Sequence, residues 1–164
     1  MDNIYNVWKA GGVNRWHHSD SFALRNSQDT NWGHQCRTAT LMYLLFPDSS
    51  SSAIMYALTH DNPEKLTGDI SGTTKQADAE IDLHLKGLEE QWQIDHDTNF
   101  SLSKREYMRF KLCDSLDAVL WMLTAAPSLR KRLDWRRQVQ DIKRAADTLN
   151  VGYLVTALLT EAGA

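Results

Sequence analysis

Apolar residues recur every three or four positions along most of the chain, which is the spacing of one face of an α-helix. No segment shows a convincing alternation of apolar and polar residues, as a half-buried strand would. The pattern predicts helices over residues 32–46, 53–60, 73–94, 104–126, 130–149 and 152–160. Pro47 and Pro127 follow two of these ranges, where a helix is expected to stop. The sequence therefore predicts an all-α helical bundle, preceded by a polar, irregular segment over residues 12–31 of the kind that often lines sites.

Composition limits the classes of protein to which the chain can belong. Its 164 residues, 42% hydrophobic and 24% charged, are expected to form a single domain over residues 1–164. The net charge of -3 argues against nucleic acid as a partner. No apolar run approaches the roughly 20 residues of a membrane span, and the start of the chain lacks a secretory pattern. We therefore expect no membrane association and a cytoplasmic location, with Cys36 and Cys113 as reduced thiols in the core.

Four separated residues carry the strongest chemical signal: His34, the adjacent pair His60 and Asp61, and Asp114. Imidazoles and carboxylates are ligands that a divalent transition metal accepts. Pro63 disfavours helical geometry in the residue before it, so the His-Asp pair is expected where a helix ends. If the four side chains meet, the chain is a metal-dependent hydrolase. Two alternatives stay open, namely a thiolate ligand and Asp117 in place of Asp114, which it follows by one helical turn.

Cationic residues near these positions indicate an anionic substrate. Lys111 lies three residues before Asp114 and is expected on the same helix face. Lys75 and Arg15 are further candidates for neutralising phosphate charge. Each of them alone is most often a solvated surface residue. Their value as a prediction is collective.

Several short motifs occur in a specific order: Asn14-Arg15-Trp16, Gly33-His34-Gln35, His60-Asp61-Asn62-Pro63-Glu64, Leu66-Thr67-Gly68-Asp69, Lys75 and Lys111-Leu112-Cys113-Asp114. This ordered set resembles the HD-domain phosphohydrolases, and within them the YfbR-like 5'-deoxynucleotidases. The chain length and the Trp32-Gly33-His34-Gln35 segment are also similar to phage dATP triphosphohydrolases, which remove dATP where phage DNA carries 2-aminoadenine. Gly33 departs from the nucleotidase pattern, which has glutamate beside the first metal ligand. That departure weakens a simple transfer of monophosphatase specificity.

The resemblance implies an HD-domain helical bundle and a site built from these motifs. One divalent transition metal per site, zinc, cobalt or manganese, would be bound by His34, His60, Asp61 and Asp114. Glu64 would orient a water molecule or take its proton, and Asp69 would protonate the departing deoxyribose oxygen, although the two roles can be exchanged. Arg15, Lys75 and Lys111 would hold the phosphates, and Trp16 would pack on the sugar or base.

Simpler interpretations exist for the same residues. Glu64 can be ordinary surface charge, Asp69 can cap a turn, and Trp16 can be a buried anchor. The function that the resemblance implies is hydrolysis of dATP to deoxyadenosine and triphosphate, by a homo-oligomer in the cytoplasm of a phage-infected host cell. The alternatives are a deoxynucleoside 5'-monophosphatase and an HD scaffold that binds a partner without catalysis.

Overall fold

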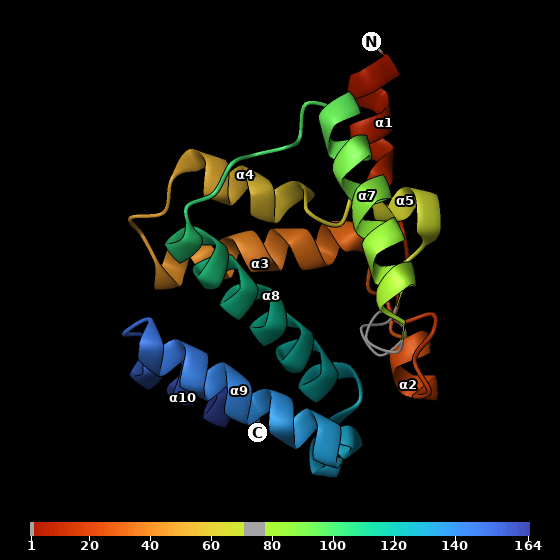
Figure 1. Ribbon diagram of the computed structural model, residues 1–164. Coiled ribbons are helices and arrows are strands. Elements are labelled where there is room, and N and C mark those ends of the chain that lie inside the picture. Colours follow the sequence, from red (N-terminus) through yellow and green to blue (C-terminus); the bar gives the residue numbers. More distant parts are fainter. Residues whose placement is uncertain (1, 71–77) are drawn as a thin grey trace.

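The computed structural model describes residues 2–70 and 78–164, and its regular secondary structure is helical throughout these ranges (Figure 1). The elements are α1 (Asp2–Ala10), α2 (Phe22–Arg25), α3 (Asn31–Leu45), α4 (Ser51–Thr59), α5 (Glu64–Thr67), α7 (Ala79–Asp95), α8 (Lys104–Ala125), the 3-10 helix η1 (Pro127–Lys131), α9 (Leu133–Thr148) and α10 (Gly152–Glu161). Within the described ranges, β-type pairing is limited to an isolated bridge between Asn14 and Thr30. The prediction of an all-α fold is confirmed.

Side-chain caps explain where the main helices begin. Thr30 accepts a hydrogen bond from the Gly33 amide at the start of α3. Ser50 does the same for Ala53 in α4, and Ser103 forms a capping box with Glu106 at the start of α8. Such hydroxyl caps satisfy amides that lack a partner inside the helix. The observed bounds of α3, α4 and α8 agree with the predicted ranges to within two residues.

The prediction differs from the structure in three places. The helix expected over residues 73–94 begins at Ala79 in the described part of the chain, and residues 73–77 lie outside that part. The helices α1, α2 and α5 were not predicted. Helices α2 and α5 have four residues each, which is too short for a periodic pattern to show. Cys113 is buried as expected, whereas Cys36 is exposed, so its assignment to the core is wrong.

Helix α8 is the centre of the molecule, with α3 and α4 packed on one side and α9 and η1 on the other (Figure 1). Its apolar face contributes Leu116, Val119 and Met122 to the core, each with no exposed surface. The same helix also carries Asp114 and Asp117 toward α3. Because burying a carboxylate costs free energy unless it is paired, two acidic residues at this position call for specific partners.

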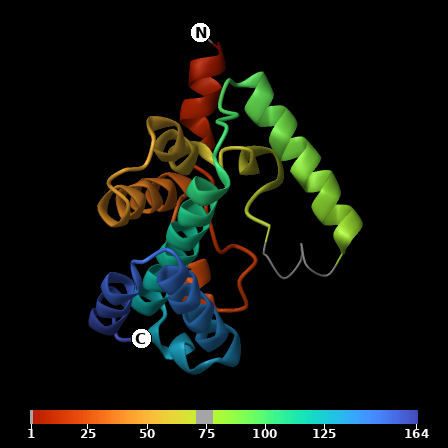
Figure 2. The same cartoon turned by 60° about the vertical axis from the view of Figure 1, so that its left-hand side comes forward.

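Helix α7 runs along the outside of the molecule, away from α9 and α10 (Figure 2). Leu85 and Trp92 anchor it by burying their side chains, while Ile81 and Leu83 of the same helix are exposed.

Among the described helices, none combines the length and the apolar character that a membrane crossing requires.

Candidate metal centre

His34 lies in the first turn of α3 and is completely buried. Its Nδ1 atom is 2.7 Å from Oδ2 of Asp117 on α8. A carboxylate only accepts hydrogen bonds, so Nδ1 carries the hydrogen in the neutral ring and the Nε2 lone pair is free. The first turn of α3 and the middle of α8 therefore hold this imidazole with Nε2 available as a ligand.

His60 follows the last residue of α4 and is held in a similar way. Its Nδ1 atom is 2.9 Å from the carbonyl oxygen of Ala57, one of the carbonyls left without a helical partner at the end of α4. The chain then turns tightly, with the Asn62 amide donating to the Thr59 carbonyl. Because α4 stops here, His60 and the adjacent Asp61 can face the same point, which two neighbours inside a continuous helix could not do. The predicted placement of the His-Asp pair at a helix end is confirmed.

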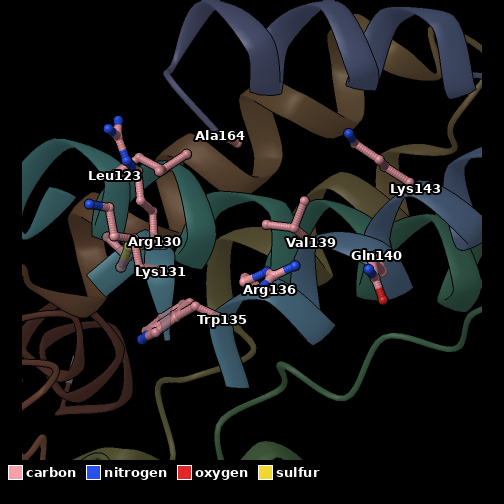
Figure 3. Close-up of a pocket in the computed structure, with 10 residues that line it drawn as sticks. Leu123, Arg130, Lys131, Trp135, Arg136, Val139, Gln140, Lys143 and Ala164 are labelled. Carbon is pink, nitrogen blue, oxygen red and sulfur yellow. The ribbon is translucent and has the colours of Figure 1, made fainter. Parts of the chain in front are cut away.

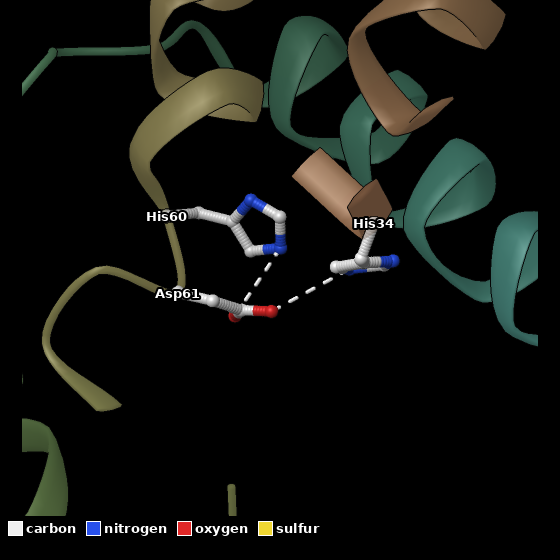
Figure 4. Close-up of side chains that lie close together, drawn as sticks. All are labelled: His34, His60 and Asp61. Atoms are coloured by element: carbon white, nitrogen blue, oxygen red, sulfur yellow. Dashed lines mark ion pairs between the residues drawn. The ribbon is translucent and has the colours of Figure 1, made fainter. Parts of the chain in front are cut away.

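Ligand atoms of His34, His60 and Asp61 lie within 4.8 Å of one another, and this group can hold a metal ion (Figure 4). The Asp61 carboxylate oxygens are 3.2 Å from Nε2 of His60 and 3.5 Å from Nε2 of His34. Both Nε2 atoms are buried and form no hydrogen bond of good geometry in the described structure, and the nearest acceptor of His34 Nε2 is Asp114 Oδ1 at 3.1 Å. Two buried ring nitrogens without a hydrogen-bond partner, facing one carboxylate, are the arrangement that a divalent cation satisfies.

Asp114 approaches the same point from α8. Its Oδ1 atom is 3.1 Å from Nε2 of His34 and 3.9 Å from Nε2 of His60, while Oδ2 is 2.5 Å from Nζ of Lys111. Asp117, the rival candidate, lies on the opposite edge of the His34 ring, where it bonds Nδ1. Asp114 therefore lies beside the Nε2 atoms of the three-residue group, whereas Asp117 contacts the other nitrogen of His34, and the role of Asp114 as a fourth ligand stays a prediction.

The electrostatics of the cluster reflect this concentration of negative charge. Burial lowers the pKa of His34, but the carboxylates of Asp114 and Asp117 outweigh it and raise that pKa to about 9. His60 responds differently, because burial dominates and lowers its pKa despite the nearby carboxylates. Burial opposes ionisation of Asp61, yet the two histidines and Arg15 hold its pKa below the usual value. The carboxylates around His34 thus favour its protonated, positively charged form when no metal is bound.

Metal affinity is therefore expected to depend on pH. Nε2 of His34 must lose its proton before it can bind a metal, and the pKa of His34 is about 9. The apparent association constant for Mn²⁺ should rise about tenfold per pH unit from pH 7 toward pH 9, and then level off. Calorimetric titration of metal-free protein at several pH values measures this slope. A constant affinity over the same range would show that no proton is displaced.

Glu64 does not continue the helix that precedes His60 but begins the separate short helix α5. Its Oε2 atom accepts a hydrogen bond from the Asn31 side chain at 2.9 Å, and the same amide group donates to the Asp61 carbonyl oxygen at 3.0 Å. Burial, followed by the charges of Asp61 and Asp69, raises the pKa of Glu64 to about 10. Glu64 is thus a buried carboxylic acid that Asn31 links to the Asp61 backbone, and it is not ordinary surface charge.

Asp69 accepts a hydrogen bond from the Trp16 amide at 2.7 Å, which connects the segment after α5 to the loop over residues 12–31. Trp16 itself has a positive φ of 65°. Its indole Nε1 donates to Asp29 at 3.0 Å, and its ring lies 6.0 Å from that of Trp135. Trp16 is therefore a partly buried anchor, and its contact with the sugar or base stays a prediction.

The predicted phosphate-binding cations are placed unequally. Nη1 of Arg15 lies 3.3 Å from a carboxylate oxygen of Asp29 and 3.8 Å from one of Asp117, and Lys111 pairs with Asp114. Arg15 and Lys111 therefore both lie next to the candidate metal ligands, and both form ion pairs with carboxylates. Lys75 lies outside the described residues.

The sequence did not predict the ion pairs that Arg37 forms with Asp117 and Asp29 next to His34. Nε of Arg37 donates to Asp117 at 2.7 Å and Nη2 donates to Asp29 at 2.8 Å, while the guanidinium group lies 4.4 Å from the Trp121 ring centroid. Both Asp29 and Asp117 are buried. The available signal was helical spacing, because Arg37 follows His34, and Asp117 follows Asp114, by three residues.

No protein-family model matches the chain, and no curated protein matches it.

Proposed function

We propose that this chain is a metal-dependent phosphohydrolase of the HD-domain type, which converts dATP and water to deoxyadenosine and triphosphate. The observation that carries the proposal is the pair of buried Nε2 atoms of His34 and His60, without hydrogen-bond partners, beside the carboxylates of Asp61 and Asp114. The ordered motif set supplies the reaction class and the nucleotide substrate.

The donor set suits zinc, cobalt or manganese, since neutral imidazole and carboxylate are accepted by all three. A divalent ion at such a cluster acts as a Lewis acid toward a phosphoryl oxygen. The protein contributes by holding the two histidine ligands in position before a metal binds. Asp117 holds His34 and the Ala57 carbonyl holds His60. Such partners fix the orientation of each imidazole, and they set the tautomer of the neutral ring that a metal would bind.

Glu64 and Asp69 are the groups available for proton transfer. Attack of water on the α-phosphorus forms one P–O bond and breaks the bond to the 5'-oxygen, so the water loses a proton and the 5'-oxygen gains one. Burial is the largest cause of the raised pKa of Glu64, which is about 10, and the negative charge of Asp61 is the second largest. Neutralisation of Asp61 by a metal ion would lower the pKa of Glu64, which favours the ionised form that can accept the proton of the water. Asp69, held by the Trp16 amide, is then the candidate donor to the 5'-oxygen.

One observation favours the second candidate function, a deoxynucleoside 5'-monophosphatase. Arg15 and Lys111 are both paired with carboxylates, and a triphosphate needs more unpaired positive charge than a monophosphate does. The two functions share the same metal site and the same proton-transfer groups. They differ in whether the groups beyond the α-phosphate are bound.

Product analysis separates these functions. Metal-free protein is supplemented with Mn²⁺, Co²⁺ or Zn²⁺ and incubated with dATP, dAMP and dGTP, and the nucleosides, triphosphate and phosphate are separated. We expect deoxyadenosine and intact triphosphate in equal amounts from dATP. Turnover of dAMP alone would replace the first proposal by the second. Absence of turnover with every metal, in protein that binds the metal, would leave an HD scaffold that acts as a binding protein.

A further inference from the structure

A concave site lies between α8, η1 and α9, and none of His34, His60, Asp61 and Asp114 lines it (Figure 3). The cavity measures about 600 Å³. Its floor is apolar and is formed by Met122 and Leu123 of α8 together with Trp135 and Val139 of α9. A cavity of this size and character is typical of small-molecule sites, which combine an apolar surface with a few polar groups.

The rim of the cavity is cationic. Arg130 and Lys131 of η1 and Arg136 and Lys143 of α9 surround the opening (Figure 3). Arg130 donates to the Gly163 carbonyl oxygen. Within the described part of the chain, the side chains of Lys131, Arg136 and Lys143 form no hydrogen bond or ion pair.

Two of the three acidic residues of α9 engage arginines outside the cavity lining. Asp134 pairs with Arg132 at 2.7 Å, and Asp141 pairs with Arg144. The third, Asp147, forms no ion pair with a cation of the cavity lining in the described part of the chain. In a chain with a net charge of -3, the rim is a local concentration of uncompensated positive charge around an apolar floor.

We propose that this cavity binds a small polyanion that carries a flat apolar body, as a nucleoside polyphosphate does. The edge of Trp135 and the side chain of Val139 would contact the flat body, and the cations at the rim would contact the phosphates. A nucleic-acid polymer fits less well, because the cations surround a cavity with an apolar floor and do not line an extended groove. This site does not depend on the metal cluster or on the proposed hydrolysis.

Calorimetric titration in EDTA tests the proposal, with ATP and inorganic triphosphate as probes. EDTA removes metal-dependent binding at the cluster, so the result does not depend on the proposed function. The double variant Arg136→Gln/Lys143→Gln removes two rim charges without changing buried residues. Arg137→Gln is the matched control, because Arg137 is an exposed cation of the same helix that does not line the cavity. Unchanged thermal unfolding of both variants establishes that they are folded.

We expect ATP to bind to the wild type more tightly than triphosphate, because only ATP carries the flat body. Affinity for ATP should fall at least about tenfold in the double variant and stay within about twofold in Arg137→Gln. Equal weakening by Arg137→Gln would mean diffuse attraction and would overturn the proposal. The proposal would also be overturned if the wild type bound ATP and triphosphate equally well, or did not bind ATP at all. Binding of a single-stranded oligonucleotide more tightly than ATP, weakened by Arg137→Gln, would overturn it as well.

Discussion

Replacing Asp114 by asparagine is expected to abolish metal binding at the cluster and, with it, metal-dependent hydrolysis. Asp114 Oδ1 lies 3.1 Å from Nε2 of His34, and its charge is strongly favoured in this environment. Burial raises the pKa of Asp114, but His34, Lys111 and His60 outweigh it and hold that pKa well below the usual value. Asparagine keeps the shape of the side chain and removes the charge. The loss of metal affinity should exceed the about tenfold to hundredfold that is typical when only an orienting partner is removed.

The measurement is the shift in unfolding temperature on adding Mn²⁺ to metal-free protein, together with product formation from dATP. A metal that binds only the folded state raises the unfolding temperature, so the variant should show no shift. Ser115→Ala, at the next position of α8, is the control and should respond like the wild type. A variant that keeps the metal-induced shift would remove Asp114 from the ligand set and leave His34, His60 and Asp61 as the whole group.

Local patterns were sufficient to predict most of the fold. The helical periodicity and the flanking prolines placed α3 and α8 closely, since both are long and capped. Periodicity says which residues share a face, but it does not say which other element covers that face. Cys36 illustrates the limit, because it lies in an apolar stretch of α3 and yet is exposed. Tyr43 and Leu44 of the same helix are also largely exposed.

The sequence predicted which residues come together in the candidate site, but it did not predict the residues that pair with Asp117 beside His34. His34, His60 and Asp61 could be proposed from residue type and motif order, and the structure brings them within 4.8 Å. Asp29 and Arg37 belong to no motif and have charges that are common on surfaces. Their role depends on how the loop before α3 approaches α8, which is a tertiary relation that spacing along one helix does not contain. The partner of each ligand was therefore harder to predict than the ligand itself.

Replacing Asp117, which contacts both His34 and Arg37, is expected to weaken metal binding and to destabilise the fold. Asp117→Asn should lower the affinity for Mn²⁺ about tenfold to a hundredfold, because Asp117 holds His34 in the tautomer that leaves Nε2 free. An amide is a weaker acceptor than a carboxylate and can also present its NH₂ group to Nδ1. The substitution also leaves Arg37 and Arg15 with less negative charge beside them. Breaking a buried ion pair costs about 3–5 kcal/mol, and because Arg37 is partly exposed we expect about 2–3 kcal/mol here.

Asp29→Asn is the control that separates the two consequences. Asp29 is as deeply buried as Asp117 and pairs with the same two arginines, but its side-chain contacts are with these arginines and Trp16, not with His34. It should therefore lower the free energy of unfolding by a similar about 2–3 kcal/mol, while metal affinity stays within about twofold. Denaturant titration gives the stability of both variants, and calorimetry gives their affinity for Mn²⁺. If both variants lost metal affinity equally, Asp117 would act by neutralising the arginines, and orientation of His34 would not be its role.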